Sequence, residues 1–561
     1  MGAQASIARG DGTAQELYRP PETERRLSLA FITVGFAHLA VGILLGLLQG
    51  LQHAGIDLYA YVPFVRHYYQ GLAMHGVFNV LVFTTFFIGG FLFFVAGYGF
   101  RRPLVTSGLA WTTFWLMTAG LLLVDWALLT NQASVLYTSY APLQAHPAYY
   151  LGLVLVVVGT WLQLVILLRT FFAWRRENPG KRTPLIAFGA LVTLIMWTMA
   201  SAGIAVQFVG FLLPWSLGWM QGIDPLLSRT LFWFTGHPIV YFWLLPAYIS
   251  WYFMLPRQVG GRLFSESLAR LAFLLFIPLS LPVGFHHQYL DPGVSEGYKA
   301  IHAFLTFAVF MPSAMTAFTV LASIETGGRA RGGQGRLGWL LRLPWRDPSV
   351  AAQLLAMVLF AFGGISGLIN ASFTVNLVVH NTLFVPGHFH LTVGTASALT
   401  FMGIVYWLVP YLSGRRLFSP RMGVWQAWLW FVGMTIMSRG MSWAGVLGAP
   451  RRTALGTAPY FAAEWTVPTW LTAIGGAVLT ISGLLFFINL IGTLTASPRA
   501  EKLEVPVVES APDGQDPVPG WLDRFAPWVT ATAVLVLISY GPTLYRLFGE
   551  MSLTIPGLRP Y

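Results

Sequence analysis

The stretch Thr235–Tyr248, TGHPIVYFWLLPAY, lies inside one of the most apolar parts of a very apolar chain. It carries His237 and Tyr241 four positions apart, which places both side chains on one face of a helix. Ionisable groups inside a membrane-spanning helix are costly and by default functional. The stretch therefore predicts a membrane helix with a polar functional face.

The composition extends this prediction to the whole chain. Of 561 residues, 56% are hydrophobic and only 10% are charged, whereas soluble domains carry roughly 25% charged residues. This predicts a polytopic membrane protein, in which length does not count domains because spanning helices form one bundle. The chain has no cysteine, which excludes disulfides, thiolate ligands, iron–sulfur clusters and thiol catalysis. Histidine is left as the main metal ligand.

Apolar segments of about 20 residues predict about thirteen membrane helices and an all-α fold. The segments begin near Leu29, Gln70, Leu104, Pro147, Pro184, Thr230, Leu271, Tyr298, Ser349, Phe384, Arg421, Trp465 and Ala526. The expected divisions are a tail (1–28), a catalytic core (29–496), a linker rich in proline and acidic residues (497–525), and the last helix with the carboxyl terminus (526–561).

The net charge of +12 is explained by topology. Lysine and arginine concentrate in the loops after the even-numbered segments, including Arg101-Arg102, Arg175-Arg176 and Arg415-Arg416. Cytoplasmic loops carry this excess, so we expect the amino terminus in the cytoplasm and the carboxyl terminus outside. The basic charge then gives no indication of nucleic-acid binding.

The twelve histidines divide by their depth in the predicted helices. Six are expected to be solvated or hydrogen-bonded, four in outer loops and two on apolar faces without ligand-like neighbours: His53, His67, His146, His380, His38 and His302. The others lie roughly 6–11 Å from the outer helix ends at 1.5 Å per residue: His75, His237, His286, His287, His388 and His390. Unrelated histidines would scatter in depth, so this layer predicts metal sites.

Helix geometry divides the six histidines of the layer. His388 and His390 are about 200° apart around a helix, so they face two different sites. His286 and His287 could share a metal only where their helix is irregular, as the preceding Pro282-Val283-Gly284 makes possible. With His237 they form a set suited to copper, zinc or non-haem iron. His75 with His390 could supply two axial haem ligands, and His388 one.

Four motifs occur in order on these helices: YYQGLAMHG (68–76), GHPIVYFWLLPAY (236–248), PVGFHHQ (282–288) and VPGHFHL (385–391). Together they resemble subunit I of the haem–copper oxidases, and the resemblance covers nearly the whole chain after residue 28. The resemblance implies the fold of that subunit, a bundle of membrane-spanning helices, and a set of histidine ligands for metals. The implied ligands are His75 and His390 for a low-spin haem of b type, His388 for a high-spin haem of a type, and His237, His286 and His287 for copper B.

The resemblance also implies a role for Tyr241. In the family this tyrosine is covalently joined to the first copper ligand, and it donates an electron and a proton when the O–O bond breaks. Ile239 stands where the large A family has a glutamate, and MPSAMTAFTV (311–320) lacks that family's lysine. The pattern is similar to the B family, which uses one hydroxyl proton route. The candidates for it are Tyr241, Tyr248, Tyr252, Ser265, Ser313, Thr316 and Thr319.

Two outer arginines, Arg451 and Arg452 in GAPRRTA (448–454), depart from the charge pattern of the loops. The resemblance implies that they bind haem propionates, for which guanidinium forks are suited. Asn376, where B-family relatives place an aspartate, and His380 belong to the same predicted site. Arg439 either snorkels outward or compensates charge near the propionates.

The implied activity is that of a proton-pumping cytochrome c oxidase, which reduces O₂ to water in a prokaryotic cytoplasmic membrane. Because a dinuclear copper centre needs cysteines, a partner subunit II would carry it and accept electrons from cytochrome c. One alternative is a nitric oxide reductase of the same superfamily, which normally adds carboxylate ligands and lacks Tyr241. The other is a cofactor-free transporter, which leaves the histidine layer unexplained.

Overall fold

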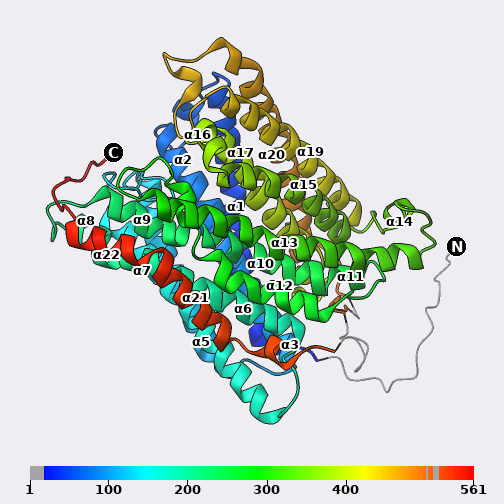
Figure 1. The fold of residues 1–561 in the computed structure, drawn as a ribbon. Helices are drawn as coiled ribbons and strands as arrows, with labels where there is room; N and C mark the ends of the chain where they lie inside the picture. Colours follow the sequence, from blue (N-terminus) through cyan, green and yellow to red (C-terminus); the bar gives the residue numbers. More distant parts are fainter. Residues whose placement is uncertain (1–17, 501–502, 509–516, 561) are drawn as a thin grey trace.

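The computed structural model describes residues 18–500, 503–508 and 517–560, and these form a bundle of helices (Figure 1). Within this described part, β-structure is limited to isolated bridges. Ten of its helices or helix runs are long and apolar enough to cross a membrane, or eleven if α21 and α22, bent by 49°, form one span. The all-α membrane fold is thus confirmed, while the count of thirteen is not confirmed as such.

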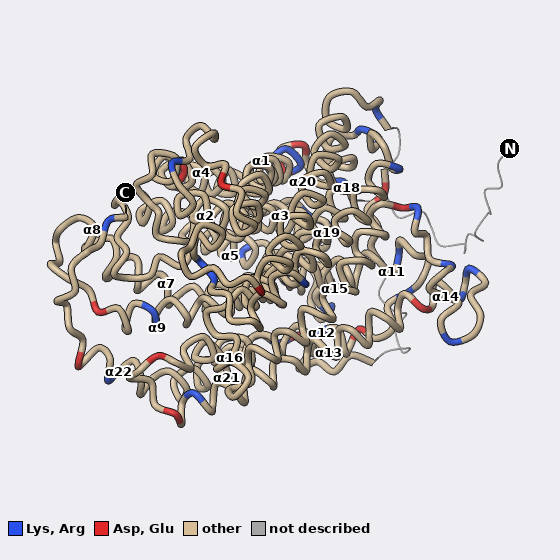
Figure 2. Tube along the Cα trace, turned by 90° about the horizontal axis from the view of Figure 1, so that it is seen from above, with Lys and Arg blue, Asp and Glu red and all other residues tan. Residues whose placement is uncertain are grey.

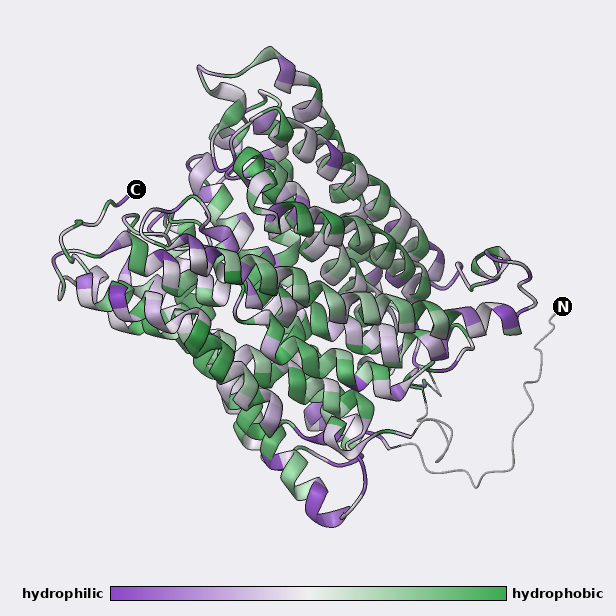
Figure 3. Cartoon of the chain, in the orientation of Figure 1, coloured by the Kyte–Doolittle hydropathy of each residue, from purple (hydrophilic) through white to green (hydrophobic). Residues whose placement is uncertain are grey.

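The long helices lie where the apolar segments predict them. Those without a break are α1 (Glu22–His53), α4 (Ser107–Leu129), α5 (Pro147–Glu177), α13 (Glu296–Ala330), α15 (Pro348–Ala371), α19 (Pro420–Val446) and α20 (Thr466–Thr495). Helices α12 (Glu266–Ser280) and α19 occupy two predicted segments but are not among the ten that pass by length and composition. Apolar residues extend along most of the helices (Figure 3), and most of the charged residues lie near helix ends and in connections (Figure 2).

The remaining spans are broken or change helix type. One span consists of α2 (Tyr68–Gly76), η2 (Val77–Phe83) and α3 (Thr84–Phe100). A second consists of α6 (Leu185–Ala200), α7 (Ala202–Gln207), η3 (Phe208–Leu212) and α8 (Leu213–Ser216). A third consists of α9 (Pro225–Gly236), α10 (Pro238–Phe253) and α11 (Leu255–Gln258). The others are α17 (Phe384–Leu391), η5 (Thr392–Ser397) and α18 (Ala398–Ser413), and the last pair, α21 (Ala526–Ser539) and α22 (Gly541–Glu550). Short elements in the connections are η1 (Tyr59–Tyr61), η4 (Gly284–His287), α14 (Gly338–Leu341), α16 (Phe373–Val379), η6 (Leu455–Thr457), η7 (Ala463–Trp465) and η8 (Gly520–Asp523).

The first helix starts earlier than its apolar segment. α1 begins at Glu22 rather than at Leu29, because its first turns are polar but still packed. The Glu24 side chain is 6% exposed and accepts a hydrogen bond from the Leu104 amide at 2.7 Å. Hydropathy locates only the apolar part of a helix. Here the helix continues toward the amino terminus into a polar turn in which a carboxylate is buried. Residues 1–17 of the predicted tail, and 501–502 and 509–516 of the predicted linker, lie outside the described residues.

The broken helices form the centre of the bundle. In the run α9–α11, 94% of the most apolar 18-residue segment is buried inside the protein. The buried share is 89% in α2–α3 and 83% in α17–α18, but only 33% in α13. These central runs carry His237, His75, His388 and His390. The fold therefore encloses these predicted ligands in broken helices, whereas most of the peripheral helices are regular and the bent pair α21 and α22 is the exception.

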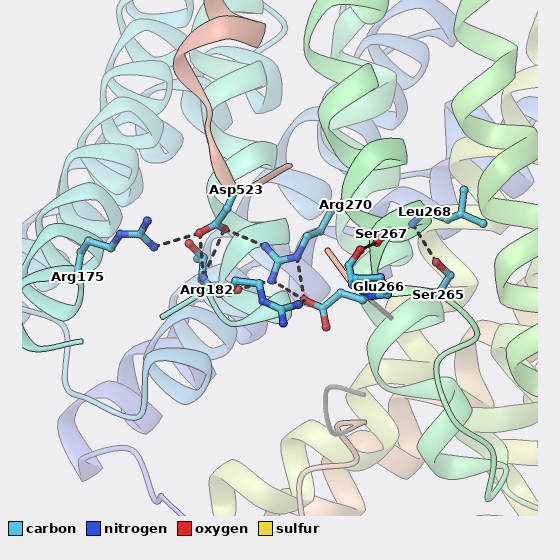
Figure 4. A network of polar contacts seen from close by, with 10 residues as sticks. Arg175, Arg182, Ser265, Glu266, Ser267, Leu268, Arg270 and Asp523 are labelled. Atoms are coloured by element: carbon cyan, nitrogen blue, oxygen red, sulfur yellow. Dashed lines mark hydrogen bonds and ion pairs between the residues drawn. The ribbon is translucent and has the colours of Figure 1, made fainter. Parts of the chain in front are cut away.

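The last two helices run along the edge of the bundle, where α21 packs on α12 and α22 reaches α9 (Figure 1). Asp523, directly before α21, is fixed by a buried ion-pair network (Figure 4). Its carboxylate accepts hydrogen bonds from Arg270 Nη1 at 3.0 Å and Arg175 Nη1 at 3.1 Å. Arg270 also donates to Glu266 at 2.9 Å, and its side chain is 1% exposed. One end of the terminal helix pair is thereby attached to α5 and α12.

Removing the Asp523 carboxylate should destabilise the bundle. We expect Asp523→Ala to leave the Arg270 charge only partly compensated in a buried site, at a cost of about 3 kcal/mol. The check is the midpoint of thermal unfolding of the purified protein, with Glu550→Ala at the exposed end of α22 as the matched control. Equal midpoints for the two variants would contradict this role of Asp523.

Candidate metal and cofactor sites

Three imidazoles meet at the centre of the bundle. One ring nitrogen from each of His237, His286 and His287 lies within 4.8 Å of the others. The His237 Nδ1 and His287 Nε2 atoms are 3.1 Å apart. Three imidazoles with nitrogens this close form a ligand set suited to a transition-metal ion, and they leave a coordination position open.

His237 lies at the break between α9 and α10. It is the residue after Gly236 and is followed by Pro238, which fits the first turn of a helix because it needs no amide donor there. One turn earlier, the Trp233 ring stacks on His287 with centroids 3.8 Å apart. One turn later, the Tyr241 hydroxyl lies 2.9 Å from His237 Nε2. Tyr241 therefore contacts the ring nitrogen that faces away from His287.

His286 and His287 belong to a 3₁₀ turn, η4, and not to an α-helix. The irregular backbone that the sequence required for a shared metal is thus present after Pro282. The His286 Nδ1 atom is 3.0 Å from the hydroxyl of Thr306 on α13. This contact leaves Nε2 of His286 to face a metal, since a histidine ligand is oriented by the bond of its other nitrogen.

His75 and His390 form a second, separate site. Their rings are nearly parallel, at 19°, and the ring centroids are 6.3 Å apart. This spacing leaves room for one metal ion with a bond of about 2 Å to each ring. The ring of His75 donates from Nδ1 to the Gly42 carbonyl at 2.8 Å, and His390 Nδ1 donates to the Pro386 carbonyl at 2.7 Å. Both rings thus keep Nε2 for the facing site.

A cavity lies beside this histidine pair. His75, His390, Arg451 and Arg452 line it together with apolar residues of α1, α17, α19 and α20. Gly46 on α1 borders it, and a Cβ atom there would come within 2.8 Å of the His75 ring. An apolar cavity between two imidazoles, with cations at one end, fits a haem with its propionates.

His388 points to a different place from His390, as their spacing predicts. Its Nδ1 atom lies 3.0 Å from the Ser366 hydroxyl and 3.1 Å from the Gly363 carbonyl, both on α15. A Cβ atom on Gly367 of the same helix would lie 3.1 Å from the His388 ring. One short helix, α17, thus presents one imidazole to each of two sites.

Helix irregularities lie at or next to five of the six predicted ligands. His75 comes just before the π-helix η2, and His390 just before the π-helix η5. His237 lies at the α9–α10 break, and His286 and His287 lie in a 3₁₀ turn. Single π turns inside α-helices occur frequently at functional sites.

Arg451 and Arg452 form a half-buried cationic cluster between α19 and α20. Arg451 donates to the Asn381 side chain at 3.0 Å, and the Arg452 guanidinium lies 5.1 Å from the Tyr140 ring centre. Among the described residues, Arg451 Nε and Arg452 Nη2 are buried without a hydrogen-bond partner. Burial and then the Arg452 charge lower the pKa of Arg451 to about 9. Unpartnered guanidinium nitrogens of this kind fit the carboxylates of a haem.

Asn376 and His380 lie together next to this cluster. The Asn376 side chain donates to the Asn370 carbonyl at 2.7 Å, and its Oδ1 atom is 3.1 Å from His380 Nδ1. Burial, and next the Arg451 charge, lower the pKa of His380 to about 4. His380 is therefore neutral at neutral pH and can donate its Nδ1 proton to Asn376.

The predicted hydroxyl route is resolved into pairs between α10 and α13. Tyr248 donates to Ser313 at 3.2 Å, and Tyr252 donates to Thr316 at 2.9 Å. Tyr241 and Tyr248 both contact the Phe276 ring. Of the two remaining candidates, Thr319 donates to the Met315 carbonyl at 2.9 Å and also contacts the Tyr252 side chain. Ser265 caps α12 by accepting from the Leu268 amide at 3.2 Å.

Two histidines have partners that the sequence did not indicate. His53 ends α1 and is buried; its Nε2 atom lies 3.1 Å from the Tyr68 hydroxyl, and it lines the His75–His390 cavity. His38 lies 3.2 Å from the Asp125 carboxylate on α4. Both contacts join residues far apart in the sequence, so periodicity within one helix gives no sign of them.

Arg439 lies on an exposed face of α19. Its guanidinium lies 5.5 Å from the ring centre of Trp443, one turn further along the same helix. Of the two alternatives for this residue, the geometry agrees with snorkelling along the helix.

Comparison with known proteins gives consistent matches. Residues 26–504 match the family model described as cytochrome c and quinol oxidase polypeptide I. The chain is 45% identical to cytochrome c oxidase subunit 1 of Thermus thermophilus, with 97% of this chain and 99% of the relative covered. It is 27% identical to cytochrome c oxidase polypeptide 1 of Halobacterium salinarum, over 78% and 72% of the two chains. A solved structure of a haem–copper terminal oxidase dimer is similar with a TM-score of 0.89 and 39% identity, covering 93% of this chain and 92% of that one.

Proposed function

Because the chain belongs to the cytochrome c and quinol oxidase polypeptide I family, and so is an oxidoreductase subunit of the haem–copper oxidases, we propose that it reduces O₂ to water. The observation that supports this most directly is the triad His237, His286 and His287, within 4.8 Å, with the Tyr241 hydroxyl 2.9 Å from His237. We assign the triad to copper B and His388 to the high-spin haem. His75 and His390 are assigned to the low-spin haem.

The bound groups supply electron transfer and O₂ reduction, and the low-spin haem is proposed to be of b type and the high-spin haem of a type. The protein side chains have three tasks. Each imidazole would hold its metal with one ring nitrogen, and the contact of its other nitrogen fixes the orientation of the ring. Tyr241 is positioned to give a proton and an electron at the copper site. Arg451, Arg452, Asn376 and His380 form the proposed propionate site.

We propose that protons reach Tyr241 through the hydroxyl route along α10 and α13. Tyr248–Ser313 and Tyr252–Thr316 supply the bonded pairs that support it, and Ser265 and Thr319 are its further candidates. Hydroxyl groups can both donate and accept a proton, which a relay requires. Ile239 offers no carboxylate where the A family has one. Some of the protons are proposed to be pumped outward.

Interrupting the route should slow turnover. We expect Thr316→Val, which keeps the shape of the side chain but removes the acceptor of Tyr252, to lower O₂ consumption on the order of tenfold to a hundredfold. Thr472→Val is the matched control, since Thr472 is also buried and donates only to its own helix at the Pro468 carbonyl. Equal rates for both variants would remove Thr316 from the route.

The electron donor is proposed to be cytochrome c, acting through a subunit II that carries a dinuclear copper centre. This chain has no cysteine for such a centre. The basic loops support a cytoplasmic amino terminus and an outer carboxyl terminus in a prokaryotic membrane.

A reduced-minus-oxidised absorption spectrum with metal analysis tests the function. We expect two haem species and one copper in this subunit. A spectrum without haem bands would refute the oxidase. Iron without copper would instead indicate a nitric oxide reductase.

A further inference from the structure

The 3₁₀ turn that carries His286 and His287 begins with two buried amides. The first amides of any helical turn have no partner within the turn. Here they belong to Gly284 and Phe285, both buried within the bundle. An unpaired amide in an apolar interior is costly, so the partners of these two groups determine where the turn can lie.

Tyr540 is the partner of the first amide. Its hydroxyl accepts a hydrogen bond from the Gly284 N–H at 3.0 Å, and the Tyr540 side chain is fully buried. A Cβ atom at position 284 would come within 2.3 Å of the Tyr540 oxygen and 2.2 Å of the Trp233 carbonyl. Only glycine allows this approach, so the turn is closely fitted between α9 and the terminal helices.

His302 on α13 is the partner of the second amide. Its Nδ1 atom accepts from the Phe285 N–H at 3.2 Å, and its Nε2 atom lies 3.3 Å from the Ser539 carbonyl. These two contacts require the tautomer with its proton on Nε2. The imidazole also stacks on the Phe285 ring with centroids 4.1 Å apart. His302 thus bridges the turn to the last residue of α21.

The terminal helices α21 and α22 supply these contacts, and the chain is anchored both before α21 and after α22. Before α21, Asp523 is bound by Arg270 and Arg175 (Figure 4). Beyond α22, the Ser552 amide donates to Asp224 at 3.1 Å. Tyr540 lies between these anchors, at the 49° bend between α21 and α22. It is therefore part of a fixed support and not of a loose helix end.

We infer that Tyr540 and His302 are positioning residues for the copper-ligand turn. They bind no metal themselves; they hold the Gly284 and Phe285 amides, and through these the backbone that orients His286 and His287. The inference rests on the proposed copper site. It gives the last helix pair a function in the active site in addition to its place in the membrane.

The test is copper retention in the purified holoenzyme. Tyr540→Phe removes the hydroxyl and keeps the ring, and we expect copper to be extracted by a chelator roughly tenfold faster, as is usual when a group that orients a ligand is lost. The infrared band of carbon monoxide on the copper should shift or broaden, while haem absorption stays unchanged. Tyr545→Phe on α22 is the control, because its ring is 86% exposed.

His302 provides a second, independent variant. His302→Leu should also release copper faster, whereas His302→Asn, which returns an acceptor near the Nδ1 position, should recover part of the retention. If only packing mattered, leucine would do at least as well as asparagine, and that result would contradict the inference. Equal extraction rates for Tyr540→Phe and Tyr545→Phe would also overturn it. A wild-type enzyme without copper would refute the proposed function instead.

Discussion

Tyr241→Phe is expected to lower the rate of O₂ reduction roughly a hundredfold or more, while both haems and copper stay bound. The substitution removes one oxygen atom, 2.9 Å from His237 Nε2, and leaves the ring in its packing. A positioned proton donor contributes on the order of 10² to 10⁴ in rate, and the proposed donation of an electron would be lost as well. The measurements are steady-state O₂ consumption and metal content.

Tyr406→Phe is the matched control for this variant. Tyr406 is also buried in a central helix, where it donates to Gln426 at 2.7 Å, away from the histidine triad. Loss of the Tyr406 hydroxyl should leave the rate of O₂ reduction close to that of the wild-type enzyme. Full turnover in Tyr241→Phe, with both haems and copper present, would show that the tyrosine has no part in breaking the O–O bond.

His390→Leu should remove the low-spin haem signal and leave the high-spin haem in place. His390 faces His75 across 6.3 Å, whereas His388 bonds to Ser366 on α15. Without one axial ligand the six-coordinate low-spin state cannot form. Turnover with reduced cytochrome c should then fall close to zero, since the proposed route for electrons passes through this haem.

His388→Leu provides the opposite result on the same helix. It should lose the high-spin signal and its carbon monoxide difference spectrum, and keep the low-spin bands. The two variants lie two residues apart, so general damage to α17 would affect both haems in both proteins. Loss of both signals in each variant would contradict the assignment of the two faces to two sites.

The metal-ligand layer could be predicted from the sequence because it depends on local geometry. His237 and Tyr241 are separated by one helical turn, and they do contact each other. His388 and His390 are separated by two residues, and they do face different neighbours. Depth along a predicted helix depends only on counting from its end, so residues on different helices could be placed in one plane before their contacts were known.

The contacts between distant helices could not be predicted in this way. His302 is hydrogen-bonded, as expected, but the sequence does not indicate that its partner is the Phe285 amide on another element. Tyr540 lies 256 positions from Gly284, and no period within either helix relates them. His38 and Asp125 form a similar case across α1 and α4. Each of these pairs needs the packing of helices, which hydropathy and spacing leave undetermined.

The π-helices η2 and η5 begin two residues after His75 and His390. A π turn holds one residue more than an α-helical turn, so deleting one residue there would restore a regular helix and leave the helix beyond it near its original orientation. The buried faces of α3 and α18 would stay in the core, while the wide turn beside the ligand would be lost. A deletion of one residue in η2 or η5 would therefore separate what the wide turn contributes to the ligand from what the helix contributes to packing, which replacing a histidine cannot do.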